Sequence, residues 1–158
     1  DGKGHFTDVG RSRGAYFNAK RSGRALVVWD YDNDGDLDIT ISHVDKDSRS
    51  VLLRNDGGNR NHWLGLTLVG KNGPAAAVSA RVTVTAGGKK QVLVNQWATS
   101  YLSNNEPRLH VGLGQVSRAD LIEIYWNNGK KEVYRNIEGD RYLTVVQGKG
   151  MYLKAPSK

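Results

Sequence analysis

Short runs in which hydrophobic and polar residues alternate recur along most of this chain, and most of them end at glycine, asparagine or aspartate. In residues 63–69 the alternation places Leu64, Leu66 and Leu68 on one face. A period of two is typical of a β-strand with one buried face, whereas a helix repeats about every 3.6 residues. Helical periodicity is nearly absent, so the pattern predicts strands and no long helix.

The alternating runs predict ten strands, separated by turn residues such as the Asn127-Asn128-Gly129 sequence. The predicted strands are 25–29, 37–43, 51–54, 63–69, 80–85, 91–95, 109–113, 121–126, 131–137 and 142–147. The later seven are short and closely spaced, which predicts an all-β fold with an antiparallel β-sandwich or barrel-like module. The first three include a hairpin around residues 30–38.

The turn-rich stretch 55–61 is the best candidate boundary within the 158 residues. The predicted organisation is a partial β unit at 1–58 and a β-sandwich at 59–150. Three strands bury too little apolar surface to be stable alone, so we expect the two parts to pack as one unit. The opening Asp1-Gly2-Lys3-Gly4 is interpreted as the interior of a longer protein.

The most specific chemistry lies in residues 30–38, where five aspartates alternate with other residues around Gly35. So many carboxylates repel one another unless a cation neutralises them. Calcium takes about 6–8 oxygen ligands, and a glycine permits the sharp turn that such a loop needs. The predicted calcium ligands are the side chains of Asp30, Asp32, Asp34 and Asp38 and the main-chain carbonyl of Asp36.

This loop has three other interpretations. An EF-hand requires a glutamate at loop position twelve and flanking helices. Ile41 occupies that position and both flanks read as strands, which excludes the EF-hand. A solvated acidic turn without metal stays open, and magnesium is the lesser metal alternative because it resists all-protein cages.

Placed between strands, the acidic loop resembles the calcium hairpin of FG-GAP/VCBS repeats, and residues 1–10 resemble the strand that closes the preceding blade in such proteins. Three later segments resemble the ASPIC/UnbV domain: 61–65 (Asn-His-Trp-Leu-Gly), 100–114, which begins Ser-Tyr-Leu-Ser, and 124–130. The resemblance covers residues 1–148. It implies a secreted, calcium-bound, non-enzymatic protein and offers no settled ligand.

Charge adds one expectation about partners. The chain has 23 basic and 16 acidic residues, and five of the acids lie in the aspartate loop. The rest of the chain therefore carries a net charge of +12. Such a surface favours a polyanionic partner, or serves only for solubility. No apolar run is long enough to span a membrane, and no nucleic-acid-binding motif is present. Without cysteines, the redox compartment stays open.

No motif predicts an enzyme, because the chain lacks the sequence patterns of nucleophile elbows, phosphate loops and zinc hydrolases. The sharper hint is Trp97, which stands in a polar turn where the ASPIC/UnbV domain usually has small residues. It either packs down as a core cap or forms a stacking platform for sugar rings. In the second case the candidate ligand-binding residues are Trp97, Tyr101, Asn104, Asn105 and Arg108.

Together these features predict a secreted, non-catalytic calcium-binding module of a larger protein. Its predicted ligand is a carbohydrate, with an anionic polysaccharide as one candidate. The alternative is a protein-interaction or adhesion module, which should show a broad apolar patch.

Overall fold

The computed structural model describes residues 4–45, 49–58 and 60–153. Asp1 to Lys3, where the first predicted unit begins, and Asn59, where the second begins, lie outside the described residues. Strands dominate, and the helices of the described part are three short 3-10 turns, η1 (Gly10–Ser12), η2 (Ala15–Asn18) and η3 (Pro74–Ala77). The all-β prediction is confirmed. In the described part of the chain, no helix has the length and hydrophobicity of a membrane-spanning segment.

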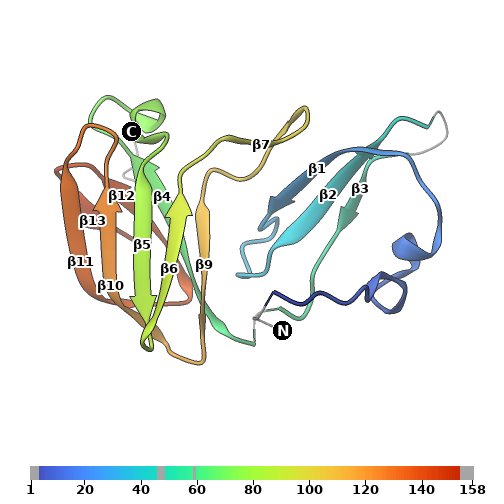
Figure 1. Cartoon of the computed structure of the whole chain (residues 1–158), viewed down its shortest axis with the longest axis horizontal. Coiled ribbons are helices and arrows are strands. Elements are labelled where there is room, and N and C mark those ends of the chain that lie inside the picture. The colour runs from blue at the N-terminus through green and yellow to red at the C-terminus, as the bar shows by residue number, and fades with distance from the viewer. Residues whose placement is uncertain (1–3, 46–48, 59, 154–158) are drawn as a thin grey trace.

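Two four-stranded sheets stack face to face and form the sandwich, on the left of Figure 1. One sheet has the order β11-β10-β5-β6 and the other the order β13-β12-β4-β9. The strands of the two sheets are β4 (His62–Val69), β5 (Arg81–Ala86), β6 (Lys89–Val94), β9 (Leu109–Gly114), β10 (Arg118–Tyr125), β11 (Lys131–Glu138), β12 (Arg141–Val146) and β13 (Gly150–Tyr152).

The sandwich core forms where the inward faces of the two sheets meet. Leu64, Leu66 and Leu68 of β4 lie in one continuous cluster with Val82 and Val84 of β5, as the alternation predicts. Their burial removes apolar surface from water at about 25 cal/mol per Å², which makes this cluster the main source of stability.

One strand pairing differs from the antiparallel prediction. β12 pairs with β4 in parallel, with Tyr142 opposite Gly65 and Leu143 opposite Leu66. The pair forms between strands far apart in the sequence, so no hairpin turn fixes its direction. The remaining pairings within the two sheets are antiparallel.

A separate three-stranded sheet precedes the sandwich and consists of β1 (Gly23–Trp29), β2 (Asp38–His43) and β3 (Val51–Leu53). β1 and β2 form the predicted hairpin, in which Trp29 pairs with Asp38 at the ends of the aspartate loop. This sheet lies on the right of Figure 1.

A short hairpin from the sandwich reaches this three-stranded sheet. It is formed by β7 (Ala98–Ser100) and β8 (Ser103–Asn104), which the sequence pattern did not predict. Beyond its turn, Ser103 Oγ donates to Leu26 O at 3.1 Å. Val28 N donates to Asn105 Oδ1 at 3.0 Å, and Glu106 N donates to Val28 O at 3.4 Å. The free edge of β1 is therefore held by the sandwich.

We expect the whole chain to unfold in one transition, because β1 satisfies its edge hydrogen bonds with residues 103–106 and its sheet has only two other strands in the described part of the chain. Differential scanning calorimetry tests this, and a fragment of residues 60–148 should be less stable than the full chain. Two separate transitions, or a fragment as stable as the full chain, would contradict the prediction.

Candidate metal centre

The aspartate loop connects β1 to β2 and brings three carboxylates together. Asp30, Asp32 and Asp38 each offer an oxygen, and these three oxygens lie within 4.8 Å of one another. Ligands on opposite sides of a calcium ion at about 2.3–2.6 Å are separated by about 5 Å, so the three oxygens fit around a single ion. Asp30 and Asp38 are buried, with 1% and 0% of their surface exposed, whereas Asp32 is exposed.

Main-chain amides orient the two buried carboxylates. Asp34 N and Gly35 N donate to Asp30 Oδ1 and Oδ2, at 3.2 and 2.9 Å. Tyr31 N and Asn55 N donate to the two oxygens of Asp38, each at 2.8 Å. A carboxylate oxygen has two lone pairs, so each can accept an amide and still face a cation. The backbone therefore holds these ligands in place.

The carboxylates of Asp34 and Asp36 are not members of the three-residue group. Asp34 Oδ1 accepts the Asp36 amide at 2.8 Å, and Asp36 Oδ2 accepts the Gly58 amide at 2.7 Å. Burial raises the pKa of Asp36, and the nearby charges of Asp34, Asp30 and Asp38 add to this effect, which the Gly58 amide partly offsets. These two carboxylates hold main-chain amides next to the three-carboxylate group. The predicted role of Asp36 as a ligand rests on its main-chain carbonyl.

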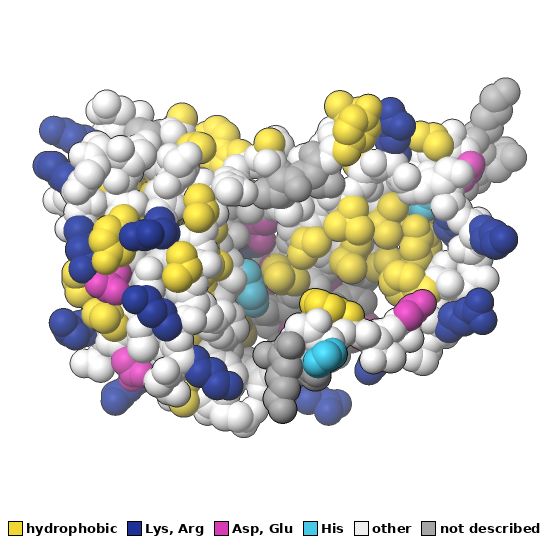
Figure 2. Space-filling model, viewed as in Figure 1, with side chains coloured by type: hydrophobic (Ala, Val, Ile, Leu, Met, Phe, Trp, Pro, Cys, Tyr) yellow, Lys and Arg dark blue, Asp and Glu magenta, His cyan; other side chains and the backbone are white. Residues whose placement is uncertain are grey.

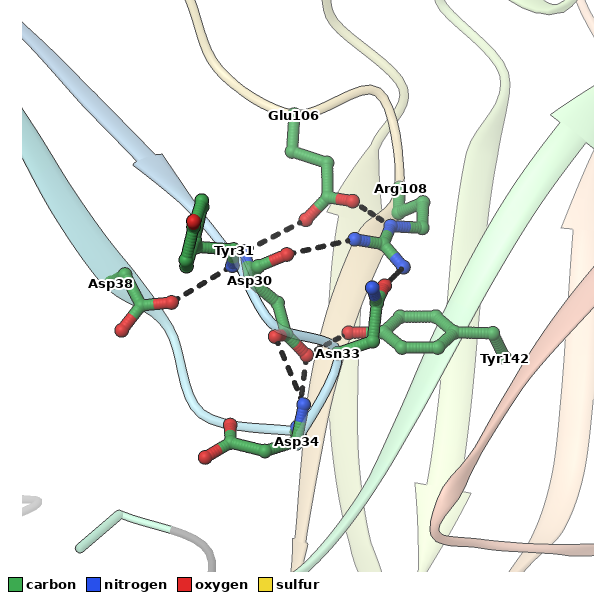
Figure 3. Close-up of polar contacts among 9 residues, drawn as sticks. Asp30, Tyr31, Asn33, Asp34, Asp38, Glu106, Arg108 and Tyr142 are labelled. Carbon is green, nitrogen blue, oxygen red and sulfur yellow. Dashed lines mark hydrogen bonds and ion pairs between the residues drawn. The ribbon is translucent and has the colours of Figure 1, made fainter. Parts of the chain in front are cut away.

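Two residues of the sandwich part bind the main chain of Asp30 (Figure 3). Asp30 N donates to Glu106 Oε2 at 3.1 Å, and Arg108 Nη2 donates to Asp30 O at 3.1 Å. Arg108 also donates to Asn33 Oδ1 at 2.7 Å and forms an ion pair with Glu106. Arg108, predicted as a ligand donor, is therefore engaged within the chain.

Tyr142 of β12 completes this network, and sequence reasoning missed it. Its hydroxyl donates to Asp30 Oδ2, and the Arg108 guanidinium carbon lies 3.9 Å from the centre of its ring. Burial and the bond to Asp30 raise the pKa of Tyr142, so the hydroxyl keeps its proton and donates. Tyr142 lies 112 positions from Asp30 in an ordinary alternating strand, and no local pattern marks it.

The loop also packs against Trp63 of β4. Gly35 has a φ of +95°, and a Cβ there would lie 2.0 Å from Trp63 Nε1. The Trp63 ring stacks on His110 at 5.7 Å and lies 4.8 Å from Tyr142. Burial among these groups lowers the pKa of His110. Gly35 thus allows the loop to lie close to Trp63, and it also permits the turn that the sequence predicts.

The residues predicted to bind a ligand do not all line one cavity, and Arg108 lies beside Asp30, as described above. Trp97, with 40% of its surface exposed, lines a cavity of about 410 Å³ together with Asn104 and Asn105. Leu68, Pro74, Asn95, Pro107 and Thr67 form the rest of its wall. Tyr101 does not line this cavity. Arg24 donates to its hydroxyl at 2.9 Å and lies over its ring.

Fold and site together define an all-β module in which an acidic, metal-compatible loop is bound to a β-sandwich. The profile of the family described as ASPIC and UnbV matches residues 70–151, and this chain belongs to that family. The chain is 29% identical over 126 residues to cartilage acidic protein 1 of Homo sapiens, an alignment that covers 79% of the chain and 19% of the relative.

Two further relatives carry the same name. The Mus musculus protein has the same identity and coverage. The Xenopus tropicalis protein is 29% identical over 109 residues, which covers 68% of this chain and 17% of that protein. The chain thus spans about a fifth of the length of the curated relatives that it matches.

We expect Gly35→Ala to lower the free energy of unfolding by about 2 kcal/mol or more, because the new methyl group meets Trp63 at a positive φ. Urea denaturation without calcium measures the change. The matched control is Gly57→Ala in the neighbouring turn, where a Cβ meets open space, and it should stay within about 0.5 kcal/mol of the wild type. Equal effects of the two substitutions would contradict the packing role of Gly35.

Proposed function

We propose that this chain is a non-catalytic, extracellular, calcium-binding module that binds carbohydrate as part of a larger secreted protein. The observation that carries the metal assignment is the convergence of Asp30, Asp32 and Asp38 on a space of calcium size. All three side chains donate oxygen, the ligand type that calcium prefers, whereas zinc favours nitrogen and sulfur. We interpret the loop and β1 to β3 as a partial FG-GAP/VCBS repeat.

The extracellular location is supported by the calcium affinity expected of such a site. Calcium sites in extracellular modules have dissociation constants of about 10⁻⁴–10⁻³ M. A group of three carboxylates, one of them exposed, suits that weak range. The relatives bear a name that refers to cartilage, a tissue rich in extracellular matrix.

The non-catalytic assignment is supported by the contacts of three of the four glutamates. Glu123 lies 2.6 Å from Lys131 Nζ, and Glu106 pairs with Arg108. Glu132 accepts the Tyr134 hydroxyl at 2.7 Å and the Gly148 amide at 2.7 Å. Carboxylates that serve as acid and base in a hydrolase keep oxygens free for the substrate, whereas these three bind other groups of the chain.

Carbohydrate binding is supported by the Trp97 cavity. An exposed indole provides a flat apolar surface for a sugar ring, and Asn104, an exposed lining residue, supplies an amide group. The lining residues are uncharged, so the cavity itself suits one neutral face of a sugar. The +12 charge outside the aspartate loop favours chains that carry sulfate or carboxylate groups beyond the cavity.

A second function, protein interaction, is favoured by the three-stranded sheet. Strand pairing places six aliphatic residues on one face of it: Leu26, Val28, Ile39, Ile41, Val51 and Leu53. Leu26 is exposed, and Figure 2 shows hydrophobic side chains gathered over this sheet. Such a patch is typical of a surface that contacts another protein or domain.

Removal of calcium should lower the melting temperature of the wild type. At a calcium concentration 100 times the dissociation constant, preferential binding stabilises the fold by about 2.7 kcal/mol. Asp32→Asn should abolish this response at little cost to the calcium-free fold, because Asp32 is exposed and its ion-pair partner Arg54 is 4.0 Å away. Thermal melts in 10 mM calcium and in EDTA provide the measurement.

Asp56→Asn is the control for that experiment, because Asp56 is an exposed acid that pairs with Arg54 and lies outside the three-carboxylate group. It should respond to calcium as the wild type does. Identical wild-type melting curves in calcium and in EDTA would refute the metal assignment.

Trp97→Ala should abolish binding on a glycan array and leave the melting temperature nearly unchanged, because a platform residue contributes little to the core. Tyr152→Ala is the matched control, since Tyr152 has 39% of its surface exposed and lies outside the cavity. It should bind glycans as the wild type does, and binding to sulfated or uronic chains should weaken as salt rises. A loss of several degrees for Trp97→Ala would instead make Trp97 a core cap and favour the protein-interaction function.

A further inference from the structure

Asp30 belongs both to the metal group and to the contact with the sandwich. Its carboxylate is one of the three that converge, and its main-chain N and O bind Glu106 and Arg108. Asp30 Oδ2 also accepts two donors, the amide of Gly35 from its own loop and the hydroxyl of Tyr142 from β12. A movement of the sandwich relative to the loop would therefore move a predicted metal ligand.

Tyr142 is held firmly enough to orient that ligand. Its ring contacts the guanidinium of Arg108, whose carbon lies 3.9 Å from the ring centre, and the indole of Trp63, whose ring centre is 4.8 Å away. On β4, Gly65 lies opposite Tyr142, and a Cβ at Gly65 would lie 2.1 Å from the Tyr142 ring. The missing side chain of Gly65 therefore leaves the space that the ring fills. With these three residues against the ring, the hydroxyl points at Asp30 (Figure 3).

We infer that Tyr142 and Arg108 are positioning residues for the metal, so that the sandwich sets the calcium affinity of a loop in the N-terminal sheet. This inference rests on the proposed calcium site. Tyr142 hydrogen-bonds the carboxylate of Asp30, whereas Arg108 acts through the Asp30 main-chain oxygen and the Tyr142 ring. Groups that hydrogen-bond a ligating side chain fix its orientation, and their loss typically weakens metal binding about 10–100-fold. A neutral phenol adds this constraint without placing a positive charge beside the cation.

The coupling acts in both directions. If contact with the sandwich increases the affinity for calcium by some factor, then calcium stabilises that contact by the same factor. Calcium would thus hold the three-stranded sheet in its present position on the sandwich. That sheet carries the apolar face, and its edge meets residues 103–106, which adjoin the Trp97 cavity through Asn104 and Asn105. Calcium binding would therefore influence both candidate binding surfaces, the apolar face and the Trp97 cavity.

The test compares Tyr142→Phe with Tyr134→Phe by calorimetric calcium titration of the full chain. Both tyrosines are partly buried and both donate to a carboxylate, but Tyr134 bonds Glu132, which is outside the metal group. We expect Tyr142→Phe to bind calcium about 10–100-fold more weakly and Tyr134→Phe to match the wild type. Melting in EDTA separates the roles, because a purely structural tyrosine lowers calcium-free stability and leaves affinity unchanged.

A second pair of variants keeps the charge constant. Arg108→Lys retains the positive charge near the ion but loses the forked contacts to Asp30 and Asn33, so its affinity should fall. Arg24→Lys is its control, because Arg24, like Arg108, stacks on a tyrosine. That tyrosine is Tyr101, and Arg24 donates to its hydroxyl. This pair decides the question alone if Tyr142→Phe does not fold. Wild-type affinity in Tyr142→Phe or Arg108→Lys overturns the inference, whereas a wild type that binds no calcium refutes the proposed site itself.

Discussion

The buried carboxylate of Asp30 is the group on which the arrangement of this protein most depends. An ionised carboxylate removed from water is costly unless hydrogen bonds or opposite charges compensate it. Here the compensation comes from two parts of the chain, the amides of its own loop and the hydroxyl of Tyr142. Because donors from both parts meet at one carboxylate, the geometry of the loop is tied to its contact with the sandwich.

The remaining structure provides the rigidity that this contact needs. The core between the two four-stranded sheets places β4 and β12 side by side, and these strands supply Trp63 and Tyr142. All four residues from Trp63 to Leu66 are buried, because one face of β4 meets the core while the other lies under Gly35 and Tyr142. A strand that would be half exposed in an ordinary sandwich is thereby covered on both faces.

Most of the fold could be predicted from the sequence because its strands alternate clearly. Each of the ten predicted strands overlaps an observed one, since residues such as Leu64 and Val82 alternate with polar neighbours. The β7–β8 hairpin was missed because its strands are two or three residues long and its turn needs a positive φ at Leu102. The parallel pairing of β12 was missed because it joins distant segments without a hairpin.

The candidate metal loop could likewise be predicted, because its residues are adjacent in sequence. Its dependence on Tyr142 could not, because nothing local distinguishes that tyrosine from Tyr134. Arg108 was singled out for its hydrogen-bonding capacity, which the structure uses within the chain for Asp30 and Asn33. Composition identifies such a side chain as a donor, and only the fold shows which acceptor it meets.

The separation of 112 positions between Asp30 and Tyr142 also has a consequence for biosynthesis. At about 5–20 residues per second, a ribosome needs roughly 6–22 s to extend the chain from one residue to the other. Throughout that interval the aspartate loop exists without the tyrosine that orients it. The loop can therefore reach its final geometry only after β12 has been made and has entered the sheet beside β4.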